Sequence, residues 1–284
     1  MDDGNLIFII SQPRSGSTFL QSLLSNNPLV NTTSEPWLML ALSPLFKPQL
    51  VKRATYDHAM ASDAYSEFCS KINVVPKKLI RDFAFAHYGQ LIEENKFFLD
   101  KTPRYWEILD ELLDIFPKAK IILLKRNPYD VICSMIKTWK IEHLEDLVYL
   151  GRDLCIAPGA ISSFAEKNSL SPNIRSVTYE ALIEKKSEKT SELYDWLEIP
   201  YHQKVLDISC NHKILGKYGD PFINGGTKIE CEIDPKWKDL ISGYLNFLGQ
   251  DYLQEFNLSA DAFFPSKDFA RFKELVDSTG NLIK

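Results

Sequence analysis

Cysteine is scarce in this chain and forms none of the patterns that bind metals or build disulfide frameworks. The 284 residues contain five scattered cysteines, with no CxxC pair and no cysteine–histidine cluster at metal-ligand spacing. An odd, dispersed set is typical of free thiols in a reducing compartment. We therefore expect no metal site and no disulfide framework from Cys69, Cys133, Cys155, Cys210 and Cys231.

Long hydrophobic runs are also missing. The first apolar run, residues 6–10, is short and follows an acidic start, whereas an export signal has basic residues and a longer apolar core. The next most apolar stretch, residues 37–46, is interrupted by Ser43 and Pro44 and falls short of the ~20 residues of a membrane helix. These features predict a cytoplasmic protein that does not enter a membrane.

An excess of positive charge is absent as well. The chain has 33 basic and 38 acidic residues, for a net charge of −5. This balance disfavours a broad surface for DNA, RNA or sulfated polymers, although it leaves room for one local anion pocket. With 45% hydrophobic and 25% charged residues, the composition is that of an ordinary globular protein.

Short apolar runs alternate along the chain with segments of helical periodicity. Such alternation predicts an α/β fold with a central parallel sheet of four to five strands. Residues 36–95 and 141–168 are expected to be helical insertions that line a pocket, and the glycine- and proline-rich stretch 211–235 a long mobile loop. The expected strands are 5–11, 96–101, 120–126 and 173–179, and the expected helices are 18–24, 104–116, 128–140, 180–197 and the segments after 234.

The first strand runs into a loop with the residues of an anion site, QPRSGST. A glycine-containing turn before a helix leaves backbone N–H groups free to hold a phosphate or sulfate, and Arg14 adds a forked positive charge. An ordinary capped helix start is the alternative interpretation. A nucleotide triphosphatase loop is disfavoured, because GxxxxGK[ST] requires glycine at Ser11 and lysine at Ser17.

A second candidate anion site follows the strand at residues 120–126. Arg126 ends this strand, where ligands bind in such sheets, and Asn127-Pro128 starts the next helix. Ser134 lies about two turns into that helix, so both side chains could bind one phosphate. A surface ion pair of Arg126 and a packing role of Ser134 are the alternative. Two anion sites suggest a nucleotide with phosphates at two positions, such as 3′-phosphoadenosine 5′-phosphosulfate.

Four segments resemble motifs of the sulfotransferase family, and they occur in the family's order between residues 13 and 182. PRSGSTFLQSLL is similar to its 5′-phosphosulfate loop, LLKRNPYDVICSM to its 3′-phosphate strand and helix, LDKTPRYW to its central lysine segment, and VTYEAL to a late strand-to-helix junction. The pattern is closest to bacterial and cyanobacterial metabolite sulfotransferases. The resemblance implies a P-loop-like, three-layer fold and a single sulfotransferase domain over 1–284.

The resemblance also implies the donor and the residues that bind it. A sulfuryl group would pass from 3′-phosphoadenosine 5′-phosphosulfate, leaving adenosine 3′,5′-bisphosphate as product, with no metal. Tyr179 is a candidate nucleotide contact. By position, the 5′ side of the donor is expected to be bound by Arg14, Ser15, Gly16, Ser17 and Thr18, and the 3′-phosphate by Arg126 and Ser134.

The residue expected to act as the base differs from the one used in one branch of the family. Small-molecule cytosolic sulfotransferases have a histidine two residues after the central lysine, where Lys101 is here followed by Thr102 and Pro103. Protein-tyrosine sulfotransferases instead resemble this chain in having a glutamate after the loop, and Glu35 stands 21 residues beyond Arg14. We therefore predict Glu35 as the base and Lys101 and Arg14 as charges that stabilise the leaving phosphate.

Other interpretations of these residues remain open. Glu35 also suits a helix start, Lys101 could be a solvated lysine, and lone histidines could act as bases. The acceptor is expected to be a hydroxyl or amine of a small specialised metabolite, such as a natural product or toxin. A protein-tyrosine or glycan acceptor, a small-molecule kinase and a nucleotide-binding module without turnover are the alternatives. The three histidines considered are His58, His87 and His143.

Overall fold

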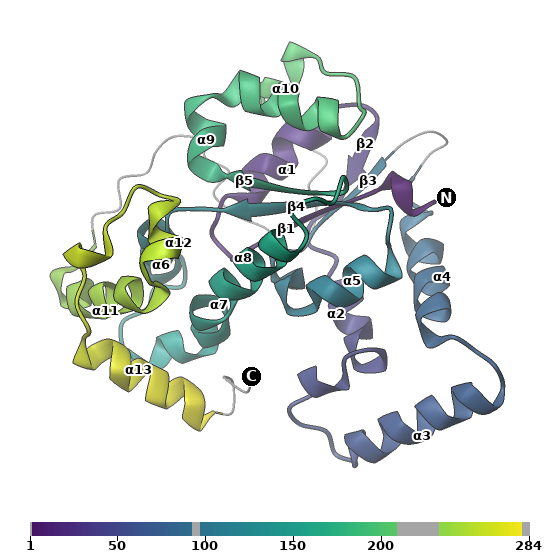
Figure 1. The fold of residues 1–284 in the computed structure, drawn as a ribbon, viewed down its shortest axis with the longest axis horizontal. Coiled ribbons are helices and arrows are strands. Elements are labelled where there is room, and N and C mark those ends of the chain that lie inside the picture. Colours follow the sequence, from purple (N-terminus) through teal and green to yellow (C-terminus); the bar gives the residue numbers. More distant parts are fainter. Residues whose placement is uncertain (1, 93–96, 209–232, 280–284) are drawn as a thin grey trace.

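A five-stranded parallel sheet forms the centre of the protein, whose computed structural model describes residues 2–92, 97–208 and 233–279. The strand order is β2-β3-β1-β4-β5 (Figure 1). All six residues of β1 are buried, as expected for the central strand of a sheet covered on both faces. The strands are β1 (Leu6–Ser11), β2 (Val30–Thr32), β3 (Phe97–Lys101), β4 (Lys120–Lys125) and β5 (Ile174–Thr178).

Alternate residues of the strands face the two helical layers. Ile7 and Ile9 of β1 pack in a cluster with α1 (Ser17–Ser25) and α10 (Lys186–Trp196). Figure 1 shows these helices together with α9 (Tyr179–Glu184) on one face of the sheet. The predicted three-layer α/β architecture is confirmed.

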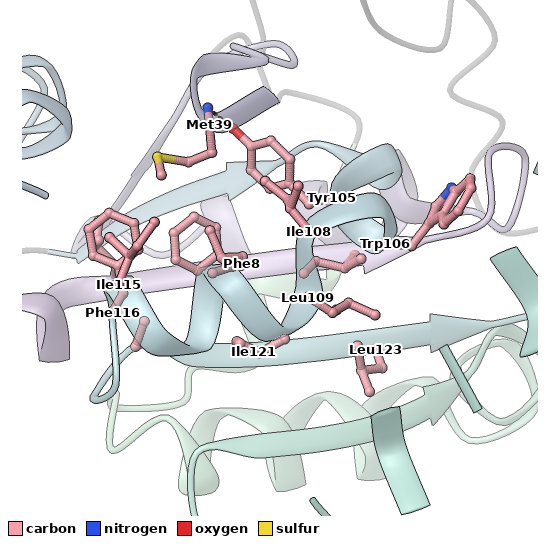
Figure 2. Packing of buried hydrophobic residues seen from close by; sticks show 14 of the residues in the cluster. Phe8, Met39, Tyr105, Trp106, Ile108, Leu109, Ile115, Phe116, Ile121 and Leu123 are labelled. Atoms are coloured by element: carbon pink, nitrogen blue, oxygen red, sulfur yellow. Dashed lines mark hydrogen bonds between the residues drawn. The ribbon is translucent and has the colours of Figure 1, made fainter. Parts of the chain in front are cut away.

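The opposite face of the sheet is apolar and aromatic. Phe8 lies against Phe116 and Tyr105, with ring centroids 5.7 and 6.1 Å apart. Figure 2 shows these rings in one cluster with Ile121 and Leu123 of β4. The helices on this face are α2 (Leu38–Leu42), α4 (Pro76–Tyr88), α5 (Leu109–Ile115), α7 (Gly151–Cys155) and α8 (Ala157–Lys167), and α3 (His58–Lys71) extends from it.

A third apolar cluster lies beyond the carboxyl ends of the strands. It joins α6 (Pro128–Thr138) to the C-terminal helices, with the fully buried Tyr244 and Phe272 among its members. Figure 1 places α6 and the C-terminal helices side by side. These helices are α11 (Lys238–Leu248), α12 (Gln250–Gln254) and α13 (Lys267–Ser278).

The structure corrects several sequence-based boundaries. Strand β2 was not predicted, because three residues with one apolar side chain give no recognisable pattern. The helix expected over 104–116 begins as a 3-10 turn, Pro103–Ile108, and the one expected over 180–197 is broken at Lys185, whose φ is −124°. The helix expected over 128–140 ends at Thr138. Most of the loop expected over 211–235 lies outside the described residues.

The remaining organisation agrees with the sequence. Residues 36–92 and 141–168 contain α2 to α4 and α7 to α8, joined by turns. Within the described ranges, no helix is both long enough and apolar enough to cross a membrane.

Candidate active site

The loop after β1 turns sharply where the chain enters α1. Gly16 has φ of 87°, in the left-handed region, and it occupies the N-cap position of the helix. A Cβ atom at this position would lie 2.3 Å from Cδ2 of Tyr179, so a larger residue would clash as well as strain the backbone. The fold therefore requires glycine at position 16, because of both the positive φ and the close contact with Tyr179.

The loop presents polar groups to the start of this helix. The Oγ atom of Ser15 is buried without a hydrogen-bond partner, and Ser17 and Thr18 are buried at the first turn of α1. A buried hydroxyl without a partner, as in Ser15, is unfavourable unless a ligand completes its hydrogen bonds. Together with the free N–H groups of a helix N-terminus, these polar groups suit an anionic group.

The two candidate anion clusters lie against each other. Nε of Arg14 donates to Oγ of Ser134 at 3.1 Å, and Nη1 of Arg126 donates to the carbonyl oxygen of Arg14 at 3.0 Å. Arg14 therefore connects the loop after β1 with the helix after β4. These strands are neighbours, and Ser11 pairs with Leu124 at their carboxyl ends.

Arg126 is held in place but keeps hydrogen-bonding capacity. Its guanidinium carbon lies 4.6 Å from the ring centroid of Tyr179, and its Nη2 lies 4.0 Å from the carboxylate of Asp130. Its Nε atom is buried and has no partner. The donors of Arg126 and the hydroxyl of Ser15 fit a ligand with an anionic group at each end.

Glu35 and Lys101 meet at the carboxyl ends of β2 and β3. Nζ of Lys101 lies 2.7 Å from Oε1 of Glu35; the lysine side chain is fully buried and that of Glu35 is 17% exposed. Strands β2 and β3 are parallel neighbours, with Thr32 opposite Leu99. Glu35 follows the end of β2 and Lys101 ends β3, so this pairing brings the two side chains together. Lys101 also pairs with Ile9 of β1, which leads into the loop.

The three candidate histidines lie elsewhere. The Nδ1 atom of His87 contacts the carbonyl oxygen of Phe83 within α4, and His58 contacts Tyr56 and Ser62 at the start of α3. His143 is exposed in the turn after α6. Glu35 is thus the candidate base that contacts Lys101.

Sequence reasoning missed an ion pair beside Glu35. Nη2 of Arg104 donates to Oδ2 of Asp153 at 2.6 Å, and Nε of Arg104 reaches both carboxylate oxygens. Arg104 stands three residues after Lys101 in the central lysine segment, which could have singled it out. Asp153 has no such signal, because it comes from α7, far along the chain.

The comparisons with known proteins agree with this geometry. A sequence model described as the sulfotransferase family matches residues 6–203. Nodulation protein NoeE of Sinorhizobium fredii is 36% identical over 143 residues, and an uncharacterized protein of Aquifex aeolicus is 25% identical over 208 residues. These alignments cover 50% and 71% of this chain but 33% and 26% of the two relatives, so the chain corresponds to only part of each.

Two solved structures share the fold. The sulfotransferase domain from the curacin biosynthetic pathway has a TM-score of 0.51 at 20% identity, covering 98% of both chains. The sulfotransferase domain from the Synechococcus PCC 7002 olefin synthase also has a TM-score of 0.51, at 19% identity, covering 100% of this chain and 98% of that one. The family match over most of the chain, on a parallel sheet with this loop after its central strand, means that the chain belongs to the sulfotransferase family.

Proposed function

We propose that this protein transfers a sulfuryl group from 3′-phosphoadenosine 5′-phosphosulfate to a hydroxyl or amine of a small specialised metabolite. The observation that carries the proposal is the hydrogen-bonded cluster of Arg14, Ser134 and Arg126, next to Ser15 in the loop. The Lys101–Glu35 pair lies at the end of the strand on the other side of β1. A donor with a phosphosulfate at one end and a 3′-phosphate at the other matches this cluster in charge. The sulfotransferase family of the chain supports the same donor.

In this proposal the loop and Lys101 stabilise the leaving phosphate. The loop amides, the Ser15 hydroxyl and Arg14 bind the 5′ side, while Arg126 and Ser134 bind the 3′-phosphate. The donor supplies an activated sulfuryl group whose phosphate leaves as the bond to sulfur breaks. An ammonium group has three N–H donors, so Lys101 can bind Glu35 and the bridging oxygen together.

Glu35 serves as the general base. Its carboxylate accepts the proton of the acceptor hydroxyl or amine as the new bond to sulfur forms. The products are the sulfated acceptor, adenosine 3′,5′-bisphosphate and one proton. Positioning and charge stabilisation carry the catalysis, as in phosphoryl transfer.

Two observations bear on the class of the acceptor. The acidic charge balance suits a neutral or cationic acceptor better than a sulfated polymer. Two neighbours in fold are named for a curacin pathway and an olefin synthase, which favours a metabolite acceptor over a protein tyrosine or a glycan. A binding module without turnover would retain nucleotide affinity and lack transfer.

Two measurements test the function. Isothermal titration with adenosine 3′,5′-bisphosphate, and with ATP and magnesium as comparison, should give binding of the bisphosphate only. Mass spectrometry of candidate acceptors incubated with enzyme and donor should then reveal an added sulfo group. Nucleotide binding without sulfate transfer, across hydroxyl and amine panels, would favour the binding module instead.

Glu35→Gln tests the base directly. The variant keeps the shape of the side chain but cannot accept a proton, so turnover should fall by about 10²- to 10⁴-fold. Its affinity for adenosine 3′,5′-bisphosphate, measured by titration, should stay within about twofold of the wild type, because Glu35 does not bind that product. Wild-type turnover in this variant would exclude Glu35 as the base.

A further inference from the structure

Glu35 has a second partner, the indole ring of Trp37. Nε1 of Trp37 donates to Oε2 of Glu35 at 3.1 Å, while Lys101 contacts Oε1 at 2.7 Å. Each carboxylate oxygen therefore has a donor of its own. Pro36 lies between the two residues and restricts the backbone of this short segment. The carboxylate is held from two directions.

The backbone of Trp37 adopts a conformation that is unfavourable for a large side chain. Its φ is 53°, in the left-handed region, at the N-cap of α2. Such conformations persist where the surroundings impose them. Here the N–H group of Met39, in the first turn of α2, donates to the hydroxyl of the buried Tyr105 at 3.1 Å. That contact ties the start of α2 to the segment after β3.

The ring of Trp37 is also held by Arg104. The guanidinium carbon of Arg104 lies 5.6 Å from the centroid of the ring. The forked hydrogen bonds to Asp153 fix the orientation of the guanidinium. Asp153 is 3% exposed and also accepts from Nε1 of Trp106 at 3.2 Å. The side-chain amide of Gln12, just after β1, donates to the backbone oxygen of Asp153 at 2.7 Å. Contacts from several elements thus anchor the ion pair.

Arg104 is positively charged, as arginine is throughout proteins, and its surroundings favour that charge. Burial alone would lower the pKa of Arg104, but the charge and hydrogen bonds of Asp153, together with the charge of Glu35, raise it overall. Burial raises the pKa of Asp153, and the charge of Arg104 opposes that shift. A positive group is therefore fixed over the face of the Trp37 indole and within electrostatic reach of Glu35.

From these contacts we propose that Trp37 is a positioning residue for Glu35 and that the Arg104–Asp153 ion pair holds the indole in place. The proposal rests on the proposed function in taking Glu35 as the base. Lys101 must also serve the leaving phosphate, so a donor dedicated to Glu35 keeps the carboxylate aligned for the acceptor while Lys101 is shared.

The first test needs no substrate. Protein with ¹⁵N-labelled tryptophan should show five indole N–H resonances, one for each tryptophan. Trp37→Phe identifies the resonance of Trp37. In Glu35→Gln that resonance should move upfield, because a neutral amide oxygen is a weaker acceptor than a carboxylate, while the other four shift less. An unmoved Trp37 resonance would overturn the proposal.

The second test compares two tryptophans with similar surroundings. Trp196 is half-buried, donates its indole N–H to the carbonyl oxygen of Pro172 at 2.9 Å, and has the ammonium of Lys120 at 5.0 Å from its ring centroid. It lies on α10, away from Glu35. Trp196→Phe is therefore a matched control for Trp37→Phe.

Turnover can be followed as slow donor hydrolysis, in which water is the acceptor and the products are sulfate and adenosine 3′,5′-bisphosphate. Trp37→Phe should lower kcat about tenfold, the effect of losing a hydrogen bond to a charged group, with bisphosphate affinity within about twofold of the wild type. Arg104→Lys, which keeps the charge but loses the fork, should show an intermediate loss. Trp196→Phe should behave as the wild type.

The outcomes separate the positioning role from the function. If Trp37→Phe and Trp196→Phe have equal kcat, Trp37 does not position the base, and the sulfotransferase function stands. If wild-type protein neither binds the bisphosphate nor hydrolyses the donor, the proposed function fails, whereas the shift of the indole resonance still reports the Trp37–Glu35 contact.

Discussion

At the scale of single residues, the carboxylate of Asp100 supports the end of β3. It is fully buried next to Lys101 and accepts hydroxyl hydrogen bonds from Tyr88 and Tyr105 at 2.7 and 2.9 Å, and from Thr102 at 2.7 Å. Burial raises its pKa to about 6, and the three hydroxyls oppose that shift. Asp100 therefore ties α4 and the turn after β3 to the strand that carries Lys101.

Asp100 should make stability depend on pH. Its folded-state pKa of about 6 exceeds the ordinary 3.8, so between these values the folded state binds the proton and the unfolded state does not. Stability therefore falls as pH rises from about 4 to 6, by about 3 kcal/mol in total. Asp100→Asn should lack this pH-dependent contribution. The variant also loses hydrogen bonds to the three hydroxyls, which lowers its stability at every pH.

The measurement is urea unfolding of both proteins from pH 4 to pH 7. The free energy of unfolding of the wild type minus that of Asp100→Asn should decrease with rising pH, because other groups cancel in the difference. A difference that is constant or increases with pH would contradict the assignment.

At the scale of elements, the unit that matters is β1, its loop and α1. The buried strand fixes the loop at the carboxyl edge of the sheet, and the left-handed Gly16 turns the chain into the helix under the ring of Tyr179. Tyr179 in turn lies over Arg126. The conformation of one glycine thus links the two halves of the candidate nucleotide site.

Gly16→Ala should weaken both stability and nucleotide binding. A left-handed conformation costs a non-glycine residue about 1–2 kcal/mol, and the added Cβ would displace Tyr179. Titration with adenosine 3′,5′-bisphosphate should show an affinity loss of about tenfold or more.

Gly159→Ala is the matched control for that substitution. Gly159 is exposed on α8 and lacks a positive φ, and a Cβ added there would meet no atom within 4 Å beyond its chain neighbours and the nearby backbone of its own helix. Alanine there should raise stability by about 0.4–1 kcal/mol and leave binding unchanged. Equal effects of the two substitutions on binding would refute the special role of Gly16.

At the scale of the whole molecule, the C-terminal helices lie outside the segment matched by the family and contact residues at the strand ends next to the candidate site. The family match ends at residue 203, yet the hydroxyl of Tyr244 on α11 accepts from Gln12 at 3.2 Å. Nζ of Lys125, at the end of β4, contacts Glu255 after α12 at 2.8 Å. The C-terminal layer therefore buttresses two strand ends that carry the candidate site.

The packing of α13 against α7 can be tested in the same layer. A Cβ on Gly151 would lie 2.4 Å from Cγ1 of Val276, which is fully buried and stiff. Gly151→Ala should destabilise the protein by about 1–3 kcal/mol through overpacking. Adding Val276→Ala should relieve the clash.

Denaturation of both single variants and the double variant measures the coupling. The double variant should lose less stability than the sum of the single losses, by about 0.5–3 kcal/mol. Additive losses would mean that the two residues do not compete for the same space.

Much of the fold could be predicted from local patterns. The strands at 6–11, 97–101, 120–125 and 174–178 are confirmed within one residue at each end. The apolar runs of β1, β3 and β4 are buried almost throughout, whereas the edge strand β5 is partly exposed and was recognised from its β-branched residues. The single helix expected over 180–197 was wrong, because chain breaks such as that at Lys185 depend on packing rather than periodicity. The roles assigned to Glu35 and Lys101 stay predictions, although the two side chains are in contact.

The sequence alone determined the α/β class and the loop with its required glycine, since these depend on patterns within a few residues. Only the tertiary structure decided which side chains meet. Glu35 reaches Lys101 because the unpredicted β2 pairs with β3, and Arg104 is fixed by Asp153 from a distant helix. Strand order and helix packing are set by the burial of many side chains at once, so no local pattern contains them.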